Sequence, residues 1–282
     1  MVNFESVRNI AFLEPVNSFS DMAKDEFCTR FNLQNCFTTP MTTIKQIVDY
    51  VGQNPDTLGV LPLENTIDGT IRESLDCLMY SENPNIKIIA EIIIPIELCL
   101  LSKTTEFYSI TGLISTPRLL GKCQEFIQNE LPRHLNLIET PTMLEAANDL
   151  RNHNLTYASI GNRKIAQNCM LNILKENIND DKNNNTKYIL IGSIETDITG
   201  NDKTTVAFKT SNTPGALLEI LKIFSEHNIN LSYISSCPSR KEQGKYTFII
   251  NLDGHIKDSN IANAIEEIKP KTSFFKCLGS YN

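Results

Sequence analysis

Residues 57–75 read TLGVLPLENTIDGTIRESL and contain, in order, an apolar run, a polar turn and the start of a helix. Residues 58–61 are the β-type run, ENTIDG is the turn, and Thr70 with Glu73 forms a capping-box pair before the helix. The apolar residues of that helix share one face: Ile71, Leu75, Leu78 and Met79. A strand that passes through a turn into an amphipathic helix is the repeating unit of an α/β domain.

The same alternation extends over residues 3–191 and predicts an α/β domain with a mainly parallel sheet. Further strands are expected at residues 10–13, 36–38, 86–94, 98–102, 110–115, 135–138, 157–160 and 187–191. Helices are expected after Ser18, over residues 44–51, after Thr116 and after Thr142. Residues 177–185, NINDDKNNN, are too polar to bury and predict a surface loop.

Residues 203–282 follow a different order, strand–helix–strand–strand–helix–strand, which is that of a ferredoxin-like unit. The expected strands are residues 204–210, 231–236, 245–251 and 274–278. The expected helices are residues 214–226 and 259–268. The polar stretch 195–202, ETDITGND, reads as a linker. The sequence therefore predicts two domains, residues 1–196 and 203–282.

The composition argues against several classes of partner. The 282 residues include 26 Lys and Arg against 33 Asp and Glu, a net charge of −7, so nucleic acid and anionic membranes are not expected partners. Glu91, Pro95 and Glu97 interrupt the longest apolar stretch, and no basic segment precedes an apolar run at the start. We therefore expect a cytoplasmic protein. The eight cysteines and four histidines lie apart without a CxxC pair, which predicts reduced thiols and no metal site.

The chain contains no Gly-rich phosphate loop, no GxSxG and no HExxH motif, which disfavours nucleotide-cofactor, serine-hydrolase and zinc-protease functions. Helix N-termini remain as candidate sites. Ser18, Thr70, Thr116 and Thr142 each stand where a predicted strand gives way to a helix. Free N–H groups at this edge of an open α/β sheet suit a small carboxylate, although each residue could equally be only a good cap.

Residues 59–71, GVLPLENTIDGTI, resemble the P-x-E-N-S/T-x-x-G motif of prephenate dehydratases. Residues 8–20 are similar to the GPxGTFS opening of that family, 139–147 to its EST segment and 186–188 to its TRF signature. The C-terminal unit is similar to an ACT domain, with GAL at residues 215–217 and SSCP at 235–238 in the ESRP position, and the chain closes on LGSY. The resemblance extends over nearly all of the chain.

The resemblance implies two α/β lobes like a periplasmic-binding protein, followed by a βαββαβ ACT domain. It implies conversion of prephenate to phenylpyruvate by loss of CO₂ and the ring hydroxyl, with no metal or organic cofactor. Thr186 falls on the family's catalytic threonine, Lys187 on its arginine, and Glu64 and Asn65 on residues of the site. The other implied substrate contacts are Ser18, Thr66, Gly69, Thr70, Thr140 and Thr142.

The ACT resemblance implies allosteric control by L-phenylalanine. The implied effector residues are Gly215, Ala216, Leu217, Ser235, Ser236 and Pro238, although the Glu and Arg of the ESRP motif are absent. A lone four-stranded sheet with both helices on one face leaves its other face and an edge uncovered, which predicts a homodimer or homotetramer.

Several positions depart from the family pattern. Glu14 and Asn17 replace the two glycines of the opening motif; Glu14 brings a negative charge towards an anion site, whereas Asn tolerates a left-handed backbone. Lys187 keeps a positive charge but lacks the planar fork of Arg. These departures leave open a prephenate decarboxylase-like relative, an arogenate dehydratase relative, or a non-catalytic amino-acid sensor.

Overall fold

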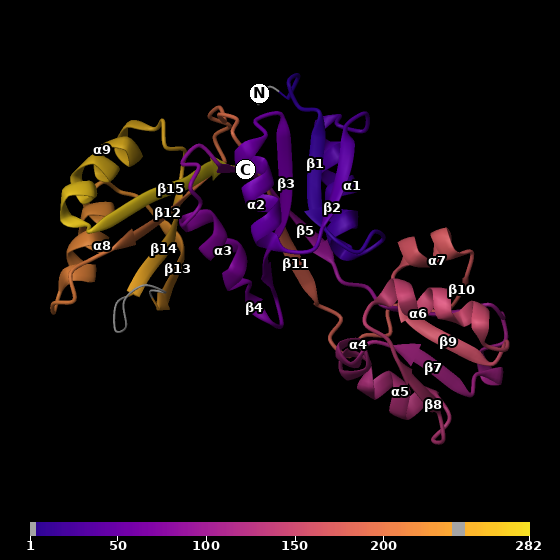
Figure 1. Cartoon of the computed structure of the whole chain (residues 1–282). Coiled ribbons are helices and arrows are strands. Elements are labelled where there is room, and N and C mark those ends of the chain that lie inside the picture. The colour runs from indigo at the N-terminus through magenta and orange to yellow at the C-terminus, as the bar shows by residue number, and fades with distance from the viewer. Residues whose placement is uncertain (1–3, 239–245) are drawn as a thin grey trace.

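The computed structural model describes residues 4–238 and 246–282, which fold into three α/β units arranged in a row (Figure 1). The middle unit, here called the first lobe, begins with β1 (Asn9–Leu13) and ends with β11 (Asn185–Gly192). Its other elements are α1 (Phe19–Phe31), β2 (Phe37–Met41), α2 (Ile44–Gln53), β3 (Thr57–Asn65), β4 (Gly69–Thr70), α3 (Arg72–Met79) and β5 (Lys87–Pro95).

The second lobe is inserted between β5 and β11 of the first. Its strands are β6 (Cys99–Ser102), β7 (Gly112–Ser115), β8 (Asn136–Glu139), β9 (Tyr157–Gly161) and β10 (Asn172–Lys175). Its α-helices are α4 (Pro117–Lys122), α5 (Gln124–Glu130), α6 (Met143–Asp149) and α7 (Arg163–Cys169), with short 3-10 turns at Phe107–Ser109 and Leu150–Asn152. The chain therefore crosses between the lobes twice, and the predicted two-lobed fold class is confirmed.

The lobe sheets are mixed rather than mainly parallel. In the first lobe the order is β2-β1-β3-β11-β5, where β1 is parallel to β2 and β3 but β11 is antiparallel to both β3 and β5. In the second lobe the order is β10-β6-β9-β7-β8, with β7 parallel to β8 and β9. The expectation of parallel pairing fails where the chain crosses between lobes, because β11 returns in the opposite direction and inserts between two earlier strands.

The C-terminal unit has the predicted βαββαβ order. It contains β12 (Lys203–Lys209), α8 (Ala216–Glu226), β13 (Leu231–Pro238), β14 (Tyr246–Asp253), α9 (Ser259–Ile268), a 3-10 turn (Lys269–Lys271) and β15 (Phe274–Tyr281). Helix α8 starts two residues later than predicted, because Gly215 adopts a left-handed φ of 88° in front of it. The predicted start of β14 at residue 245 lies outside the described residues.

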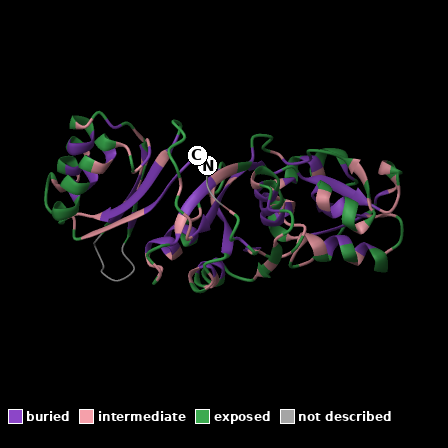
Figure 2. Cartoon of the chain, turned by 90° about the horizontal axis from the view of Figure 1, so that it is seen from above, coloured by how far each residue is buried: buried purple, intermediate pink, exposed green. Residues whose placement is uncertain are grey.

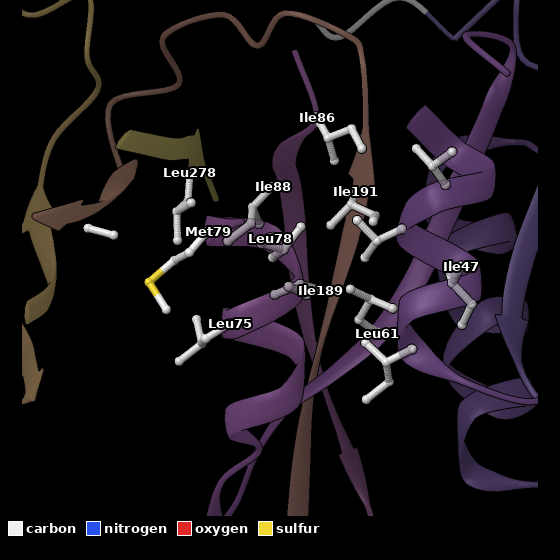
Figure 3. Close-up of a cluster of buried hydrophobic side chains, with 14 of the residues drawn as sticks. Ile47, Leu61, Leu75, Leu78, Met79, Ile86, Ile88, Ile189, Ile191 and Leu278 are labelled. Atoms are coloured by element: carbon white, nitrogen blue, oxygen red, sulfur yellow. The ribbon is translucent and has the colours of Figure 1, made fainter. Parts of the chain in front are cut away.

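Both faces of the C-terminal sheet are covered within one chain. Helices α8 and α9 pack on one face through residues such as Phe208, Ile220 and Ile261. The opposite face contributes Ile249 and Leu278 to an apolar cluster shared with α3, β5 and the first-lobe sheet (Figure 3). The reasoning that a second copy must cover this face is therefore wrong, since the first lobe covers it. Figure 2 shows buried residues along the sheets and exposed residues on the outer helices.

Gly279 makes the closest contact in this shared layer. Its φ is +148°, and a Cβ built on it would lie 2.2 Å from the carbonyl oxygen of Ile88 on β5. We expect Gly279→Ala to lower the free energy of unfolding by about 3 kcal/mol, because backbone strain adds to an overpacked contact. The matched control is Gly200→Ala, where φ is +90° and nothing lies within 4 Å of the added Cβ. Urea midpoints that fall equally in the two variants would contradict this account.

Candidate functional site

The candidate site lies at the junction of the two lobes, where strands end and helices begin. Three predicted caps are confirmed: the side chains of Ser18, Thr116 and Thr142 accept hydrogen bonds from the third residue of the turn that follows. Thr70 is not a cap, because α3 starts after Ile71 and Thr70 pairs with Glu64 in the β3–β4 hairpin. Asn17 takes the expected left-handed backbone, with φ 65°, and its N–H donates to Asp21 Oδ2 at 2.7 Å.

A buried amide on β3 organises this junction. The Oδ1 atom of Asn65 accepts hydrogen bonds from the backbone N–H groups of Ile67 and Asp68 at 3.0 and 2.9 Å. The Nδ2 atom of Asn65 therefore faces the other way and donates to Asn184 Oδ1 at 2.8 Å and to Thr186 Oγ1 at 2.9 Å. Since two backbone donors fix which atom of Asn65 is oxygen, the roles of its two neighbours follow.

Thr186 is consequently held as an acceptor of one hydrogen bond, with its own proton uncommitted. Thr186 is 6% exposed, and within residues 4–238 and 246–282 its hydroxyl donates no hydrogen bond. The neighbouring Asn184 is 2% exposed, and its Nδ2 atom has no hydrogen-bond partner in the described parts of the chain. An unpaired buried donor costs about 1–3 kcal/mol, so Asn184 Nδ2 beside the uncommitted hydroxyl proton of Thr186 marks a place built for more than packing.

Tyr188 lies on the same side of β11 as Thr186, two residues along. It is buried in the cluster beneath α1 together with Phe12 and Leu190. Burial raises the pKa of Tyr188 to about 12, against a smaller lowering by a hydrogen bond with Ser20. The phenol is therefore neutral at physiological pH.

The lobes contact each other through charged groups around this junction. Asp68 of the first lobe pairs with Arg118 at 2.5 Å and with Lys122 at 3.0 Å, both on α4. The hydrogen bond from Lys122 is the main cause that lowers the pKa of Asp68, and Arg118 adds to it. The junction thus contains two cations of the second lobe that share a single carboxylate.

A second set of contacts joins α7 to the start of α1. Lys164 pairs with Asp21 at 2.6 Å, and the side chain of Asn162 donates to the carbonyl of Asn17 at 2.8 Å. Burial opposes the charge on Asp21, but hydrogen bonds from Lys164 and Lys24 outweigh it and lower the pKa of Asp21. These contacts hold the two helix N-termini beside each other.

Three residues predicted for the site lie on the other side of the first-lobe sheet. Successive side chains of a strand point to opposite faces, so Lys187 points away from Thr186 and Glu64 away from Asn65. Lys187 Nζ lies 3.3 Å from Glu64 Oε2, and Thr70 Oγ1 lies 3.0 Å from the hydroxyl of Tyr233 in the C-terminal unit. The structure therefore separates Glu64, Thr70 and Lys187 from Asn65 and Thr186 instead of bringing all five together.

The remaining predicted contacts are divided between the lobes. Thr66 fastens the turn after β3 to the return crossing: its hydroxyl donates to the carbonyl of Asn183 at 2.9 Å, and Gly69 supplies the left-handed φ of 78° that closes the turn. Thr140 and Thr142 stand at the start of α6 in the second lobe, and neither is hydrogen-bonded to Thr186 in the structure. Their hydrogen bonds are local to the start of α6, so in the described residues neither joins the Asn65 network.

Residues 177–185 are not simply a surface loop. They form the return crossing between the lobes, and Ile178, Asn179 and Asn184 within them are buried. Asn179 replaces missing strand partners there, because it accepts from the N–H of Leu98 at 3.1 Å and donates to the carbonyl of Ile96 at 3.0 Å. The polar composition did not indicate that this segment is buried, because its amide side chains are buried with hydrogen bonds to the other crossing.

The predicted effector residues do not share one face. Ser235 is paired with Ile249, whose side chain faces the first lobe, whereas the preceding Ile234 is paired with Ile250 on the α8 side. Ser236 and Pro238 are exposed, and Gly215 precedes α8. Ser235 and Ser236 therefore point in opposite directions.

Within the described residues, no group of three or more His, Cys, Asp or Glu side chains is arranged to hold a metal ion. Likewise, none of the helices in the described ranges is both long and apolar enough to cross a membrane.

The fold and the site together define a two-lobed α/β protein with hydrogen-bond donors and cations at the lobe junction and a ferredoxin-like unit at its C-terminus. Residues 10–196 match the family model described as prephenate dehydratase, and residues 204–270 match that of the ACT domain. The chain belongs to the prephenate dehydratase family, as its motifs predicted.

Relatives and solved structures agree with this assignment. The bifunctional chorismate mutase/prephenate dehydratase of Aquifex aeolicus is 33% identical over 280 residues, which cover 99% of this chain and 75% of that protein. The prephenate dehydratase of Methanocaldococcus jannaschii is 32% identical over 227 residues, covering 79% and 80%. The structure of prephenate dehydratase from Arthrobacter aurescens in complex with L-Phe superposes with a TM-score of 0.83 at 28% identity, covering 97% of this chain and 89% of that one.

Sequence reasoning missed four residues at the junction. Asn184 and Tyr188 flank the matched Thr186, and Arg118 and Lys122 follow the confirmed cap at Thr116. The signal for the two cations was present, since Arg118 and Lys122 are the second and the last residue of the helix that begins after the cap at Thr116. The signal for Asn184 was not, because its burial depends on a crossing that only the tertiary structure reveals.

Proposed function

We propose that this protein is a carbon–oxygen lyase that converts prephenate to phenylpyruvate at the lobe junction, without a cofactor. The observation that carries this is the pair of donors at Thr186 and Asn184, which Asn65 orients. Loss of CO₂ and the ring hydroxyl makes the product aromatic, so the protein has only to hold two carboxylates and assist the departing hydroxide. The free O–H of Thr186 donates a hydrogen bond to that oxygen, which leaves as hydroxide and takes up a proton from solvent, and Asn65 is the residue that positions Thr186.

Arg118 and Lys122 supply the positive charge for the substrate carboxylates in place of Lys187. Both already bind one carboxylate, that of Asp68. The N-termini of α1 and α6, with Ser18 and Thr142, add polar groups on the two sides of the junction. A carboxylate of prephenate replaces the carboxylate of Asp68 at Arg118 and Lys122, which places the substrate between the lobes.

We expect Arg118→Met to raise KM for prephenate roughly tenfold or more with a smaller change in kcat, because a charge-assisted hydrogen bond is lost from binding. The matched control is Arg133→Met, which removes an exposed arginine from the same lobe. Steady-state kinetics of both variants provide the measurement. Equal KM values for the two variants would assign the carboxylate contact to other residues.

The substrate is tested by kinetics with prephenate and arogenate in parallel. We expect prephenate to be converted to phenylpyruvate, which is monitored by its absorbance in base. The kcat/KM for prephenate should be higher than that for the conversion of arogenate to phenylalanine. Preference for arogenate would make the protein an arogenate dehydratase. Binding of either compound without turnover would make it a sensor.

The C-terminal domain is proposed to bind L-phenylalanine next to Gly215 and to pass the signal on through oligomer contacts. Residues 1–196 then form the catalytic domain and residues 203–282 the regulatory one. In the part of the chain that the structure describes, β13 pairs only with β14 and has a free outer edge, and Ile234 on β13 and Tyr246 on β14 are each about half exposed. Pairing of this edge in a homodimer or homotetramer would cover both residues.

All eight cysteines are free thiols. Burial raises the pKa of Cys28 to about 11 and that of Cys123 to about 12. Such thiols stay protonated and unreactive, and a reducing cytoplasm is the compartment we propose for them.

A further inference from the structure

A cavity of about 260 Å³ lies between the first-lobe sheet and the C-terminal sheet, on the opposite face of the first-lobe sheet from Thr186. Its first-lobe wall contains the polar residues Glu64, Thr70 and Lys187, and its C-terminal wall contains Lys203 and Tyr233. Its apolar lining residues are Leu63, Leu75, Ile88 and Ile249. We call this space the junction cavity.

The charges in the junction cavity are paired, but loosely. Lys187 Nζ and Glu64 Oε2 are 3.3 Å apart, and their side chains keep 26% and 39% of their exposure. Because both side chains are partly exposed, water screens their attraction, and a ligand can separate the pair at little cost. Lys203 is the second cation; it pairs with Glu91 at 2.5 Å on the neighbouring strand β5.

The lining specifies a ligand with both charges and an apolar part. Lys187 and Lys203 are the cations available to a carboxylate, Glu64 is the anion available to an ammonium group, and the apolar residues accept a side chain. A ligand with only one charge would separate the Lys187–Glu64 pair and leave one member of it without a partner. At roughly 30 Å³ per water molecule, the volume of the cavity corresponds to about eight or nine waters, the size range of an amino acid.

We propose that the junction cavity binds an L-α-amino acid with an apolar side chain, within a single chain and apart from the Gly215 segment. The binding itself does not depend on the dehydratase function. Its effect on turnover does, and the register of the strands supplies the link. Lys187 is paired with Glu64 across β11 and β3, and the next pair in the same ladder is Thr186 with Asn65. A ligand that separates the first pair therefore acts on the two strands that hold the second.

Titration calorimetry on the full-length protein, without prephenate, tests the proposal. The probes are L-phenylalanine and L-leucine, with 3-phenylpropanoate and phenethylamine as analogues that each lack one charge. We expect one site per chain that takes the amino acids and whose Kd rises at least tenfold in Lys187→Met and in Glu64→Gln. The matched control Lys222→Met removes one member of an exposed ion pair on α8 and is expected to leave this site unchanged.

The outcomes separate the two sites and the two proposals. If Gly215→Val weakens phenylalanine binding and Lys187→Met leaves it unchanged, the phenylalanine is bound at the effector site proposed above. The two variants therefore test the two sites independently. If Lys187→Met does not fold, as judged by circular dichroism, the isosteric Glu64→Gln carries the test. The proposal for the junction cavity is wrong if the amino acids give no heat at millimolar concentration or if Lys187→Met and Glu64→Gln bind them as the wild type does. It is also wrong if the single-charge analogues bind as well as the amino acids.

Discussion

Replacement of Thr186 by alanine is expected to lower kcat on prephenate by about 100-fold or more, with little change in KM. A donor positioned at a departing oxygen acts mainly in the transition state, and its removal typically costs two or more orders of magnitude in rate. Thr186 holds such a donor, because Asn65 occupies its acceptor side at 2.9 Å and leaves its proton free. The measurement is steady-state formation of phenylpyruvate by the purified variant.

Two further variants separate chemistry from packing at this position. Thr186→Ser keeps the hydroxyl and is expected to recover much of the lost rate, whereas Thr186→Val keeps the shape and is expected to behave like the alanine variant. All three variants should unfold near the wild-type temperature. Turnover of Thr186→Ala close to that of the wild type would remove Thr186 from the mechanism.

Asn65→Asp is expected to be nearly as damaging as Thr186→Ala, although it changes only one amide to a carboxylate. The new carboxylate can still accept from the N–H groups of Ile67 and Asp68, so the turn after β3 is retained. Its other oxygen would face Asn184 Oδ1 and Thr186 Oγ1, where Asn65 now donates. Thr186 would then donate its proton to this carboxylate instead of to the substrate.

The double variant distinguishes this positioning role from a general loss of structure. If Asn65 acts through Thr186, Asn65→Asp combined with Thr186→Ala loses no more kcat than Thr186→Ala alone. Asn172→Asp, which alters an exposed amide on β10, serves as the matched control and is expected to retain the wild-type rate. Losses that multiply in the double variant would show that Asn65 acts independently of Thr186.

Much of the fold was predictable because local signals and tertiary structure agree. Helix α9 has the predicted bounds, and the caps at Ser18, Thr116 and Thr142 form as their spacing indicated. The mixed pairing of the lobe sheets was not predictable. It depends on β11 inserting between β3 and β5 after a long excursion through the second lobe, which no local pattern encodes.

The separation of the predicted site residues onto two faces of the sheet has a different origin. The family signature joins Thr186 and Lys187, but adjacent side chains of one strand point to opposite faces of the sheet, and this alternation was already implied by the sequence. The same holds for Glu64 and Asn65. The sequence does not reveal which part of the chain packs over Glu64 and Lys187, because their neighbour Tyr233 belongs to the C-terminal unit.

The oligomer argument failed for a related reason. An isolated ferredoxin-like sheet has an uncovered face, but here Ile249 and Leu278 on that face pack against the first lobe. Hydrophobic patterning shows that a face is buried without showing what buries it. The unpaired edge of β13 therefore remains as the surface on which the proposed association rests.

The most direct test of the central claim is the identity of the product formed from prephenate, measured by mass spectrometry after incubation of the wild-type protein at neutral pH. A dehydratase that uses Thr186 at the lobe junction should release CO₂ and water together and yield phenylpyruvate well above the spontaneous background. A product that has lost CO₂ but retained the ring hydroxyl, or prephenate recovered intact, would contradict the account.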